Sequence, residues 1–459
     1  MTMNDPTMLA DAAHWRARDL AVLWHPCTQM REHPETLPLL PISHGRGAWL
    51  YGMDGNRYLD AVSSWWTNLF GHGEPRIAAA IAEQAQRLEH VMFAGFSHQP
   101  AVQLAERLLA LAPPGLARVF LADNGSAAVE VALKMSFHSF FNRGDTHRRK
   151  FIALHNGYHG ETLGALAVGD LPLYRRIYAP LLIEPLFAPS PDAWLAEPGE
   201  SAYHRAVRAA DALAAMLAEH GATVCALILE PLVQCAGGMR MYHPEYLRRA
   251  RTLCDQHGIH LIADEIAVGF GRTGTLFACE QAAITPDFLC LSKGLTGGFL
   301  PLSAVLTSAA VYEAFLDDSR DRAFLHSHSY TGNPIACAAA LATLAIFHQE
   351  PVLERNRATA AAMARLAAPI GDHPNVAEVR QTGMILAFEL CQSHSREALP
   401  TTQRTGLCAY RAALQRGVVL RPLGDVLYWM PPYCITDDDL NHLARVTASA
   451  IAASTRSCA

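Results

Sequence analysis

Residues 261–298 contain two short apolar runs that each lead to a chemically active side chain. The first run ends in the carboxylates Asp264 and Glu265, and the second, 288–291, leads to Lys293 at a glycine-rich turn. Such runs, bounded by turn residues, are typical of strands buried in a parallel sheet. Ligands of open α/β sheets bind at the carboxyl ends of the strands. The sequence therefore predicts that Asp264 and Lys293 face one crevice, although a structural ion pair is the commoner use of an isolated Asp and Lys.

The same stretch also allows a dinucleotide-binding interpretation, because Gly269 to Gly274 has the spacing GxGxxG. That motif normally opens a long helix, and an acidic residue follows about 20 residues later. No long helical pattern follows Gly274, and Asp287 precedes its apolar run instead of ending it. The motif alone is weak evidence, and we reject a nicotinamide-binding protein on these grounds.

Composition places the chain among globular proteins with a large core. It has 459 residues, of which 51% are hydrophobic and 17% charged, enough for two domains. The net charge of −6 gives no indication of nucleic-acid or acidic-membrane partners. Eleven cysteines without a CxxC pair favour reduced thiols in the cytoplasm over a disulfide framework. The N-terminus does not resemble a signal peptide, and the apolar run 335–347 is too short to span a bilayer.

The order of the segments predicts an α/β fold with three parts. Residues 1–70 are expected to form an irregular arm and short strands of a small domain, with a hairpin at Asp54-Gly55. Residues 71–334 alternate strand-like and helix-like segments, which predicts a large domain with a mostly parallel sheet wrapped by helices. Residues 335–459 are expected to complete the smaller α+β domain.

The central stretch resembles the signature of the pyridoxal-phosphate-dependent aminotransferases of fold type I, class III. The matching segments are Ala263-Asp264-Glu265, the glycine-rich 269–274, Pro286-Asp287 and Ser292-Lys293-Gly294, with 29 residues (293 − 264) between the acid and the amine. The resemblance implies that Lys293 forms a Schiff base with pyridoxal 5'-phosphate and later acts as the catalytic base. It also implies that Asp264 keeps the pyridine nitrogen protonated, so that the ring accepts electrons.

Other cofactor contacts are implied by the same resemblance. Gly125 and Ser126, at the start of a predicted helix, correspond to the phosphate-binding turn, although a helix N-cap is the commoner use of such a pair. Tyr158 corresponds to the tyrosine that stacks on the pyridine ring and presents its hydroxyl to substrate. His328 and Ser329 correspond to a loop that reaches the partner subunit's cofactor phosphate, which implies a homodimer with the active site at its interface. Two histidines alone are too few ligands for a metal site, so the sequence predicts no metal site.

The similarity is closest to the biotin-pathway members of the family. Trp65, Trp66 and Arg421 correspond to their substrate contacts, and the arginine suits a carboxylate. Ser327 belongs to the loop expected to influence the amino donor. Cys27 replaces a tyrosine that contacts substrate in those relatives, which puts that contact in doubt. The resemblance implies amination of 8-amino-7-oxononanoate by S-adenosylmethionine. Lysine as donor, another ω-amine transaminase and a non-catalytic cofactor binder remain alternatives.

Overall fold

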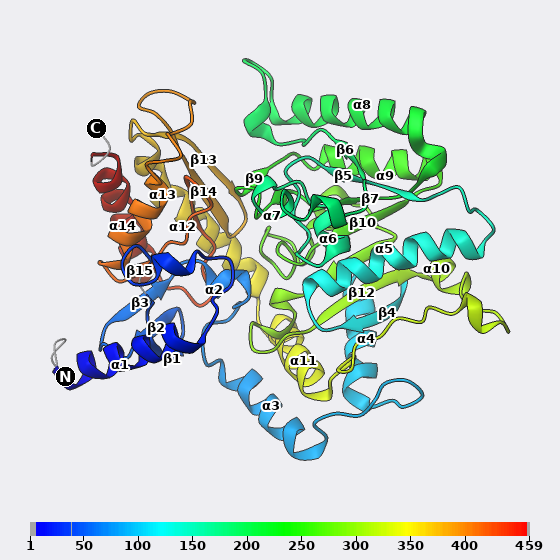
Figure 1. The fold of residues 1–459 in the computed structure, drawn as a ribbon, viewed down its shortest axis with the longest axis horizontal. Helices are drawn as coiled ribbons and strands as arrows, with labels where there is room; N and C mark the ends of the chain where they lie inside the picture. Colours follow the sequence, from blue (N-terminus) through cyan, green and yellow to red (C-terminus); the bar gives the residue numbers. More distant parts are fainter. Residues whose placement is uncertain (1–5, 38, 457–459) are drawn as a thin grey trace. The chain divides into compact units, whose positions relative to one another are not determined.

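The computed structural model describes residues 6–37 and 39–456, and Figure 1 shows its ribbon. The chain forms two compact units. The smaller unit contains Met1–Glu74, Ala361–Val379 and Leu386–Ala459, and the larger contains Pro75–Ala360 and Arg380–Ile385. Residues 1–5 of the expected arm and 457–459 of the expected C-terminal domain lie outside the described residues. Both units combine helices with sheets, so the predicted α/β class is confirmed.

A seven-stranded sheet forms the centre of the larger unit. In spatial order its strands are β4 (Leu116–Ala122), β12 (Ser303–Ser308), β11 (Phe288–Leu291), β10 (His260–Asp264), β7 (Val224–Leu229), β5 (Lys150–Leu154) and β6 (Leu186–Ala188). Only β12 runs antiparallel to its two neighbours. The remaining six strands therefore end at the same edge of the sheet, as the sequence predicted for a mostly parallel sheet.

The two strands that carry the acid and the amine are direct neighbours. β10 and β11 pair in parallel, and Asp264 lies opposite Cys290. Every residue of β7, β10 and β11 is buried, because these strands are covered on both faces. That burial explains why they read as continuous apolar runs instead of an alternating pattern.

Helices cover this sheet. The helix α5 (Gly125–Asn142) crosses it and contacts β7, β10, β11, β12 and β4. The other helices of the larger unit are α3 (Pro75–Arg87), α4 (Gln99–Leu111), α6 (Leu163–Ala167), α7 (Pro172–Arg175), α8 (Ala202–His220), α9 (Glu245–His257), α10 (Ala309–Glu313) and α11 (Pro334–Gln349). After Gly274 the chain forms only the short helix η5 (Ala278–Ala282), so no long helix follows the GxGxxG turn.

The compact units divide the chain at a different place from the expected boundary at residue 334. Residues 335–360, which include α11, belong to the larger unit. The reason is packing: α11 is almost wholly apolar and lies against α3 and α4. A separate pair of short strands in this unit, β8 (Val233–Gln234) and β9 (Arg240–Met241), follows β7.

The smaller unit contains a sheet of β1 (Ile42–Arg46), β2 (Trp49–Gly52), β3 (Arg57–Asp60) and β15 (Val418–Val419). The Asp54-Gly55 hairpin between β2 and β3 is confirmed. The expected irregular arm is wrong in part, because α1 (Pro6–Val22) is a 17-residue helix. The smaller unit also contains α2 (Ser63–Trp66), α13 (Thr405–Leu414), β16 (Val426–Trp429) and α14 (Asp437–Arg456). Three elements have residues in both units: α12 (Val352–Gly371), β13 (Val376–Thr382) and β14 (Ile385–Leu390).

A strand was expected over residues 382–390, but the structure divides this segment. β13 ends at Thr382, Gly383 turns the chain with φ +58°, and β14 begins at Ile385. A Cβ at Gly383 would lie 2.4 Å from the backbone carbon of Thr273. The glycine therefore permits a close approach of two backbones that no larger residue allows.

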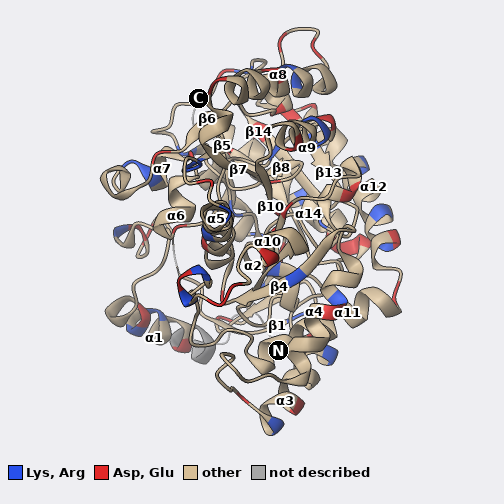
Figure 2. Ribbon diagram, turned by 90° about the vertical axis from the view of Figure 1, so that its right-hand side faces the viewer, with Lys and Arg blue, Asp and Glu red and all other residues tan. Residues whose placement is uncertain are grey.

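Charged residues of both signs are interspersed over the elements in Figure 2. Among the described residues, no single helix has both the length and the apolarity needed to cross a membrane. A pair of consecutive helices, α11 and α12, meets that test only when taken together, and the two are bent by 77° at their junction.

Candidate active site

Four neighbouring strands deliver polar side chains to the carboxyl edge of the large sheet. In the spatial order β5, β7, β10, β11, the residues that follow or end each strand are His159, Glu230, Asp264 and Lys293. Asp264 and Glu230 both act on the pKa of Lys293, so the three side chains share one environment. The structure therefore brings together the acid and the amine that the sequence predicted, and an imidazole and a second carboxyl lie at the same edge.

Asp264 is fixed by hydrogen bonds to both oxygens. His159 Nδ1 donates to Oδ2 at 2.7 Å, and the backbone N–H of Ile266 donates to Oδ1 at 3.1 Å. Asp264 is 4% exposed and His159 is 3% exposed. A hydrogen bond between a buried carboxylate and a buried imidazole is strong and directional. Asp264 is thus held in one orientation at the sheet edge.

Lys293 occupies the first position of the short helix η6 (Lys293–Thr296) with φ +31°. A left-handed backbone at a non-glycine residue is strained and persists where the surrounding structure enforces it. Burial lowers the pKa of the Lys293 amine, while Asp264, Cys235 and Glu230 act in the opposite direction. A lysine with a lowered pKa is more readily available as a nucleophile and a base.

Glu230 follows β7, the neighbour of β10 on the side away from β11, and is 5% exposed. It accepts hydrogen bonds from the backbone N–H groups of Tyr158 at 3.0 Å and Cys235 at 2.9 Å. Burial raises the pKa of Glu230 to about 7, while His159 and these N–H donors act in the opposite direction. Its backbone contacts tie the loop after β5 to the loop after β7.

The start of α5 lies close to the Asp264 strand. A Cβ at Gly125 would lie 2.9 Å from a methyl carbon of Ile266. Gly125 and Ser126 occupy the first turn of α5, where backbone N–H groups have no intrahelical acceptor. The N-cap itself is Asn124, whose side chain accepts from the N–H of Ala127. The phosphate-binding role of Gly125 and Ser126 stays a prediction, and their place at this edge agrees with it.

Ser126 is linked to the loop after β5. Its hydroxyl shares a 2.8 Å hydrogen bond with Thr162 Oγ1 and accepts from the N–H of Thr162 at 3.0 Å. Gly160, with φ +124°, passes so close that a Cβ there would lie 2.4 Å from Ser126 Oγ. The first turn of α5 and the Tyr158 loop are therefore packed as one surface.

Tyr158 is half-buried in this loop. Its hydroxyl donates to Glu161 Oε1 at 2.9 Å, and its ring lies 5.7 Å from the ring of Tyr174. The sequence predicted that the hydroxyl would face a substrate, and in the structure Glu161 accepts its hydrogen bond. The stacking role of Tyr158 remains a prediction.

The loop that carries Ser327, His328 and Ser329 lies against α5 and the end of β4. His328 Nδ1 lies 3.7 Å from Asp123 Oδ2, and both serines are exposed. These serines therefore remain open to contact with another molecule. The contact with a partner's cofactor stays a prediction.

The remaining predicted residues, Trp65, Trp66, Arg421 and Cys27, belong to the smaller unit. Arg421 lies over the ring of Trp65, with Cζ 4.4 Å from the ring centroid. Trp66 is 3% exposed and donates its indole N–H to the hydroxyl of Tyr428 at 3.0 Å, whereas Trp65 is 38% exposed. Trp66 is therefore a packing residue, and the substrate contacts of Trp65 and Trp66 stay predictions. Cys27 is exposed and has φ +52°.

The two tryptophans sit in a strained turn. The four residues 63–66 have positive φ values of 51°, 44°, 71° and 73°, and a left-handed backbone costs about 1–2 kcal/mol per residue. Asp60 stabilises the turn by accepting from the N–H of Ser64 at 3.0 Å and from its hydroxyl at 2.7 Å. His72 Nε2 holds the same carboxylate at 2.9 Å. In this turn Trp66 is buried while its neighbour Trp65 is partly exposed.

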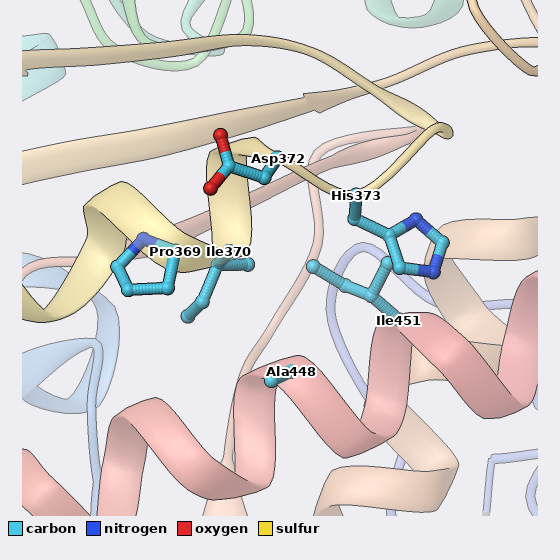
Figure 3. A pocket seen from close by; sticks show the side chains of 6 residues that line it. All are labelled: Pro369, Ile370, Asp372, His373, Ala448 and Ile451. Carbon is cyan, nitrogen blue, oxygen red and sulfur yellow. The ribbon is translucent and has the colours of Figure 1, made fainter.

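A hollow in the smaller unit is shown in Figure 3 and has a volume of about 220 Å³. It is lined by Pro369, Ile370, Asp372, His373, Ala448 and Ile451. Small-molecule sites usually enclose about 300–1,000 Å³. This hollow is smaller and contains none of the predicted site residues, so we assign it no role in the chemistry.

The residues at the sheet edge fit pyridoxal phosphate. A lysine with a lowered pKa suits its aldehyde, and a fixed, buried carboxylate suits a protonated pyridine nitrogen. The first turn of a long helix suits its phosphate. His159 Nε2 is buried and has no hydrogen-bond partner within the part of the chain that the structure describes, which marks this spot as one built for a further polar contact.

Two residues at this edge have contacts that the sequence pattern did not predict: His159 bonds Asp264, and Thr162 bonds Ser126. The Gly-Tyr-His-Gly segment was a usable signal, since a histidine beside a candidate cofactor tyrosine is available to orient a carboxylate. Thr162 gave no signal, because its contact with Ser126 joins residues 36 positions apart.

The comparisons with known proteins agree with this site. Residues 30–451 match the family described as Aminotransferase class-III. An adenosylmethionine-8-amino-7-oxononanoate aminotransferase of Helicobacter pylori is 46% identical over 92% of this chain and 94% of its own. The crystal structure of the enzyme of that name from Methanocaldococcus jannaschii has a TM-score of 0.90 at 35% identity, covering 96% and 99% of the chains. An omega transaminase from Pseudomonas jessenii in complex with PMP has a TM-score of 0.91 at 31% identity, covering 96% and 98%. The chain thus belongs to the class-III aminotransferases.

Proposed function

We propose that this enzyme transfers an amino group to the 7-keto carbon of 8-amino-7-oxononanoate, with S-adenosylmethionine as donor, in the cytoplasmic synthesis of biotin. The assignment of this substrate rests on the name that the relatives share. These relatives are up to 46% identical to this chain over most of both chains. The product is 7,8-diaminononanoate. The chemistry is supported by the adjacent strand ends that bring Asp264 and Lys293 into one environment.

Pyridoxal 5'-phosphate, when bound, supplies an electron-accepting ring on which the donor's amino group is stored and passed on. Lys293 would hold the cofactor covalently, and its free amine would take up and return a proton at the carbon that bears the amino group. Asp264, oriented by His159, would stabilise a positive charge on the ring nitrogen. Gly125 and Ser126 would bind the phosphate, and Tyr158 would pack on the ring.

The smaller unit supplies the proposed substrate contacts. Arg421 binds the carboxylate of 8-amino-7-oxononanoate, and its cation–π contact with Trp65 restricts the conformations of the guanidinium. Trp66 anchors the turn through Tyr428. Cys27 takes the place of a larger side chain in this region, and Ser327 in the loop before α11 contributes to donor choice.

We further propose a homodimer in which His328 and Ser329 contribute to the partner's cofactor site. The larger unit exposes several large apolar side chains: Leu173 and Ile177 are 83% and 76% exposed, and Leu325 and Tyr330 are 68% and 63% exposed. Apolar side chains exposed to this extent support a protein–protein interface. Leu325 and Tyr330 flank the serines of the loop, so an interface there would place Ser329 against a second subunit.

The test of the donor is direct. Purified holoenzyme is mixed separately with S-adenosylmethionine, lysine and alanine, and the visible absorbance of the bound cofactor is followed. Only the true donor should bleach it and, after addition of 8-amino-7-oxononanoate, yield 7,8-diaminononanoate by mass spectrometry. Bleaching by lysine alone would assign a lysine-dependent enzyme. Conversion of simple amines without any 7,8-diaminononanoate would instead assign an ω-amine transaminase, which the likeness to the Pseudomonas jessenii structure supports as the second candidate.

A further inference from the structure

The loop 323–333 between the short helix η7 (Arg320–Arg322) and α11 is anchored at both ends. Near its start, the ring of Phe324 lies 5.7 Å from Phe120 of β4. Near its end, His98 Nε2 lies 2.7 Å from the carbonyl oxygen of Gly332, and Asn333 donates to the carbonyl of Glu89 at 2.9 Å. In the middle of the loop, Thr331 Oγ1 bonds the backbone N–H and carbonyl of His328. Ser327 and Ser329 are exposed there, and the side chains of His326 and His328 contact α5 and the end of β4.

Those histidines form a chain of polar contacts from a cation to an anion. Lys134 Nζ of α5 lies 2.9 Å from His326 Nδ1. His326 Nε2 lies 3.3 Å from His328 Nε2, and His328 Nδ1 lies 3.7 Å from Asp123 Oδ2. We call Lys134, His326, His328 and Asp123 the histidine bridge. Its two rings are 5.1 Å apart and nearly perpendicular.

The charges of Lys134 and Asp123, at the two ends of the histidine bridge, determine which ring nitrogens carry protons. A lysine ammonium can only donate and a carboxylate can only accept, while a neutral imidazole has one donor and one acceptor nitrogen. His326 therefore accepts at Nδ1 and donates at Nε2. His328 accepts at Nε2 and presents its proton at Nδ1 toward Asp123. The bridge is satisfied only when both rings are neutral.

We propose that His326 and His328 are positioning residues that hold the middle of this loop against α5 while both rings are neutral, and that protonation of His326 releases it. An added proton on His326 Nδ1 faces the Lys134 ammonium. It replaces an attractive contact with a donor-to-donor repulsion. This inference rests on the proposed function, because Ser329 gives the loop its purpose at the partner's cofactor phosphate.

The charged surroundings set the direction of the pH response. Burial lowers the pKa of His326, Lys134 and His328 lower it further, and Glu130 of α5 acts in the opposite direction. A released loop takes up a proton more readily, since an ordinary imidazole has a pKa of about 6.5. The held state is therefore complete above that value and is lost as the pH falls through the lowered pKa of His326.

Hydrogen–deuterium exchange of the holoenzyme tests the bridge on peptides that span residues 323–333. Three proteins are compared at the same pH, so that the intrinsic exchange rate cancels: wild type, His326→Gln, which keeps one donor and one acceptor without titrating, and His326→Phe, which keeps only a ring beside Phe324. At pH 7.5, above the ordinary imidazole pKa, wild type and His326→Gln should exchange alike and His326→Phe about fivefold faster. At pH 5.5 wild type should approach His326→Phe, while His326→Gln stays slow.

The proposal is overturned if His326→Phe matches wild type at pH 7.5, or if His326→Gln loosens with falling pH as wild type does. Exchange in the strands β10 and β11 provides the control for global folding in all three proteins. Cofactor release after dilution, followed by absorbance, separates the two claims. A loop that loosens as expected without faster cofactor release keeps the bridge and removes the proposed role of Ser329.

Discussion

Replacing Glu230 with glutamine removes a carboxyl whose pKa is raised by its burial in the fold. Glu230 is 5% exposed, and burial raises its pKa from 4.5 to about 7. The N–H groups of Tyr158 and Cys235 favour the ionised form, so the raised value requires that burial outweighs two good hydrogen bonds. Whether this side chain is neutral or charged decides the net charge that surrounds Lys293.

The size of the effect follows from the two pKa values. A group with a pKa of about 7 is roughly nine-tenths protonated at pH 6, whereas one at 4.5 is roughly 3% protonated. A rise in pKa from 4.5 to about 7 corresponds to about 3 kcal/mol. Because the folded pKa is raised, this stabilisation is fully present below pH 4.5 and is lost as the pH rises through 7.

Infrared difference spectroscopy measures the protonation directly. The spectrum of wild type minus Glu230→Gln at pH 6 should contain the carbonyl stretch of a protonated carboxylic acid, and this band should vanish above pH 8. The subtraction cancels Glu265, whose pKa burial also raises to about 7. In denaturant unfolding, glutamine should gain up to about 3 kcal/mol relative to wild type between pH 5 and 8. A wild-type carboxylate that is already ionised at pH 6 would refute the reasoning and show that the backbone donors prevail over burial.

Three further changes test other parts of the site. Lys293→Ala should abolish borohydride attachment of the cofactor and lower amination by roughly 10²-fold to 10⁴-fold or more, and an unchanged rate would remove the mechanism. Gly160→Ala would place a Cβ 2.4 Å from Ser126 Oγ and should weaken cofactor retention on dialysis by about 1–3 kcal/mol. Gly144→Ala, also at positive φ but with open space around it, is the matched control and should retain the cofactor. Trp66→Phe leaves a buried tyrosine hydroxyl without its indole donor and should lower the free energy of unfolding by about 1–3 kcal/mol; equal stability by denaturant titration would contradict the packing described.

The large sheet could be predicted because its signal is local. Strands such as 224–229 and 288–291 are buried on both faces, so each reads as an unbroken apolar run in its own segment. The residues at the ends of those runs can then be read from the sequence, and this is why Asp264 and Lys293 could be predicted at the site. The helix α1 was missed because its hydrophobic pattern is weak, and its residues gave little sign of a buried face.

The sequence by itself determined which strands carry the acid and the amine, since each is fixed by its own few neighbours. Only the tertiary structure decided what surrounds them. His159 reaches Asp264 across 105 residues and past the end of β7, and the histidine bridge joins α5 to a loop 192 residues away. The left-handed turn at 63–66 likewise exists because Asp60 and His72 hold it. Such contacts depend on the order of strands and on packing between distant segments, and no short window of sequence contains that information.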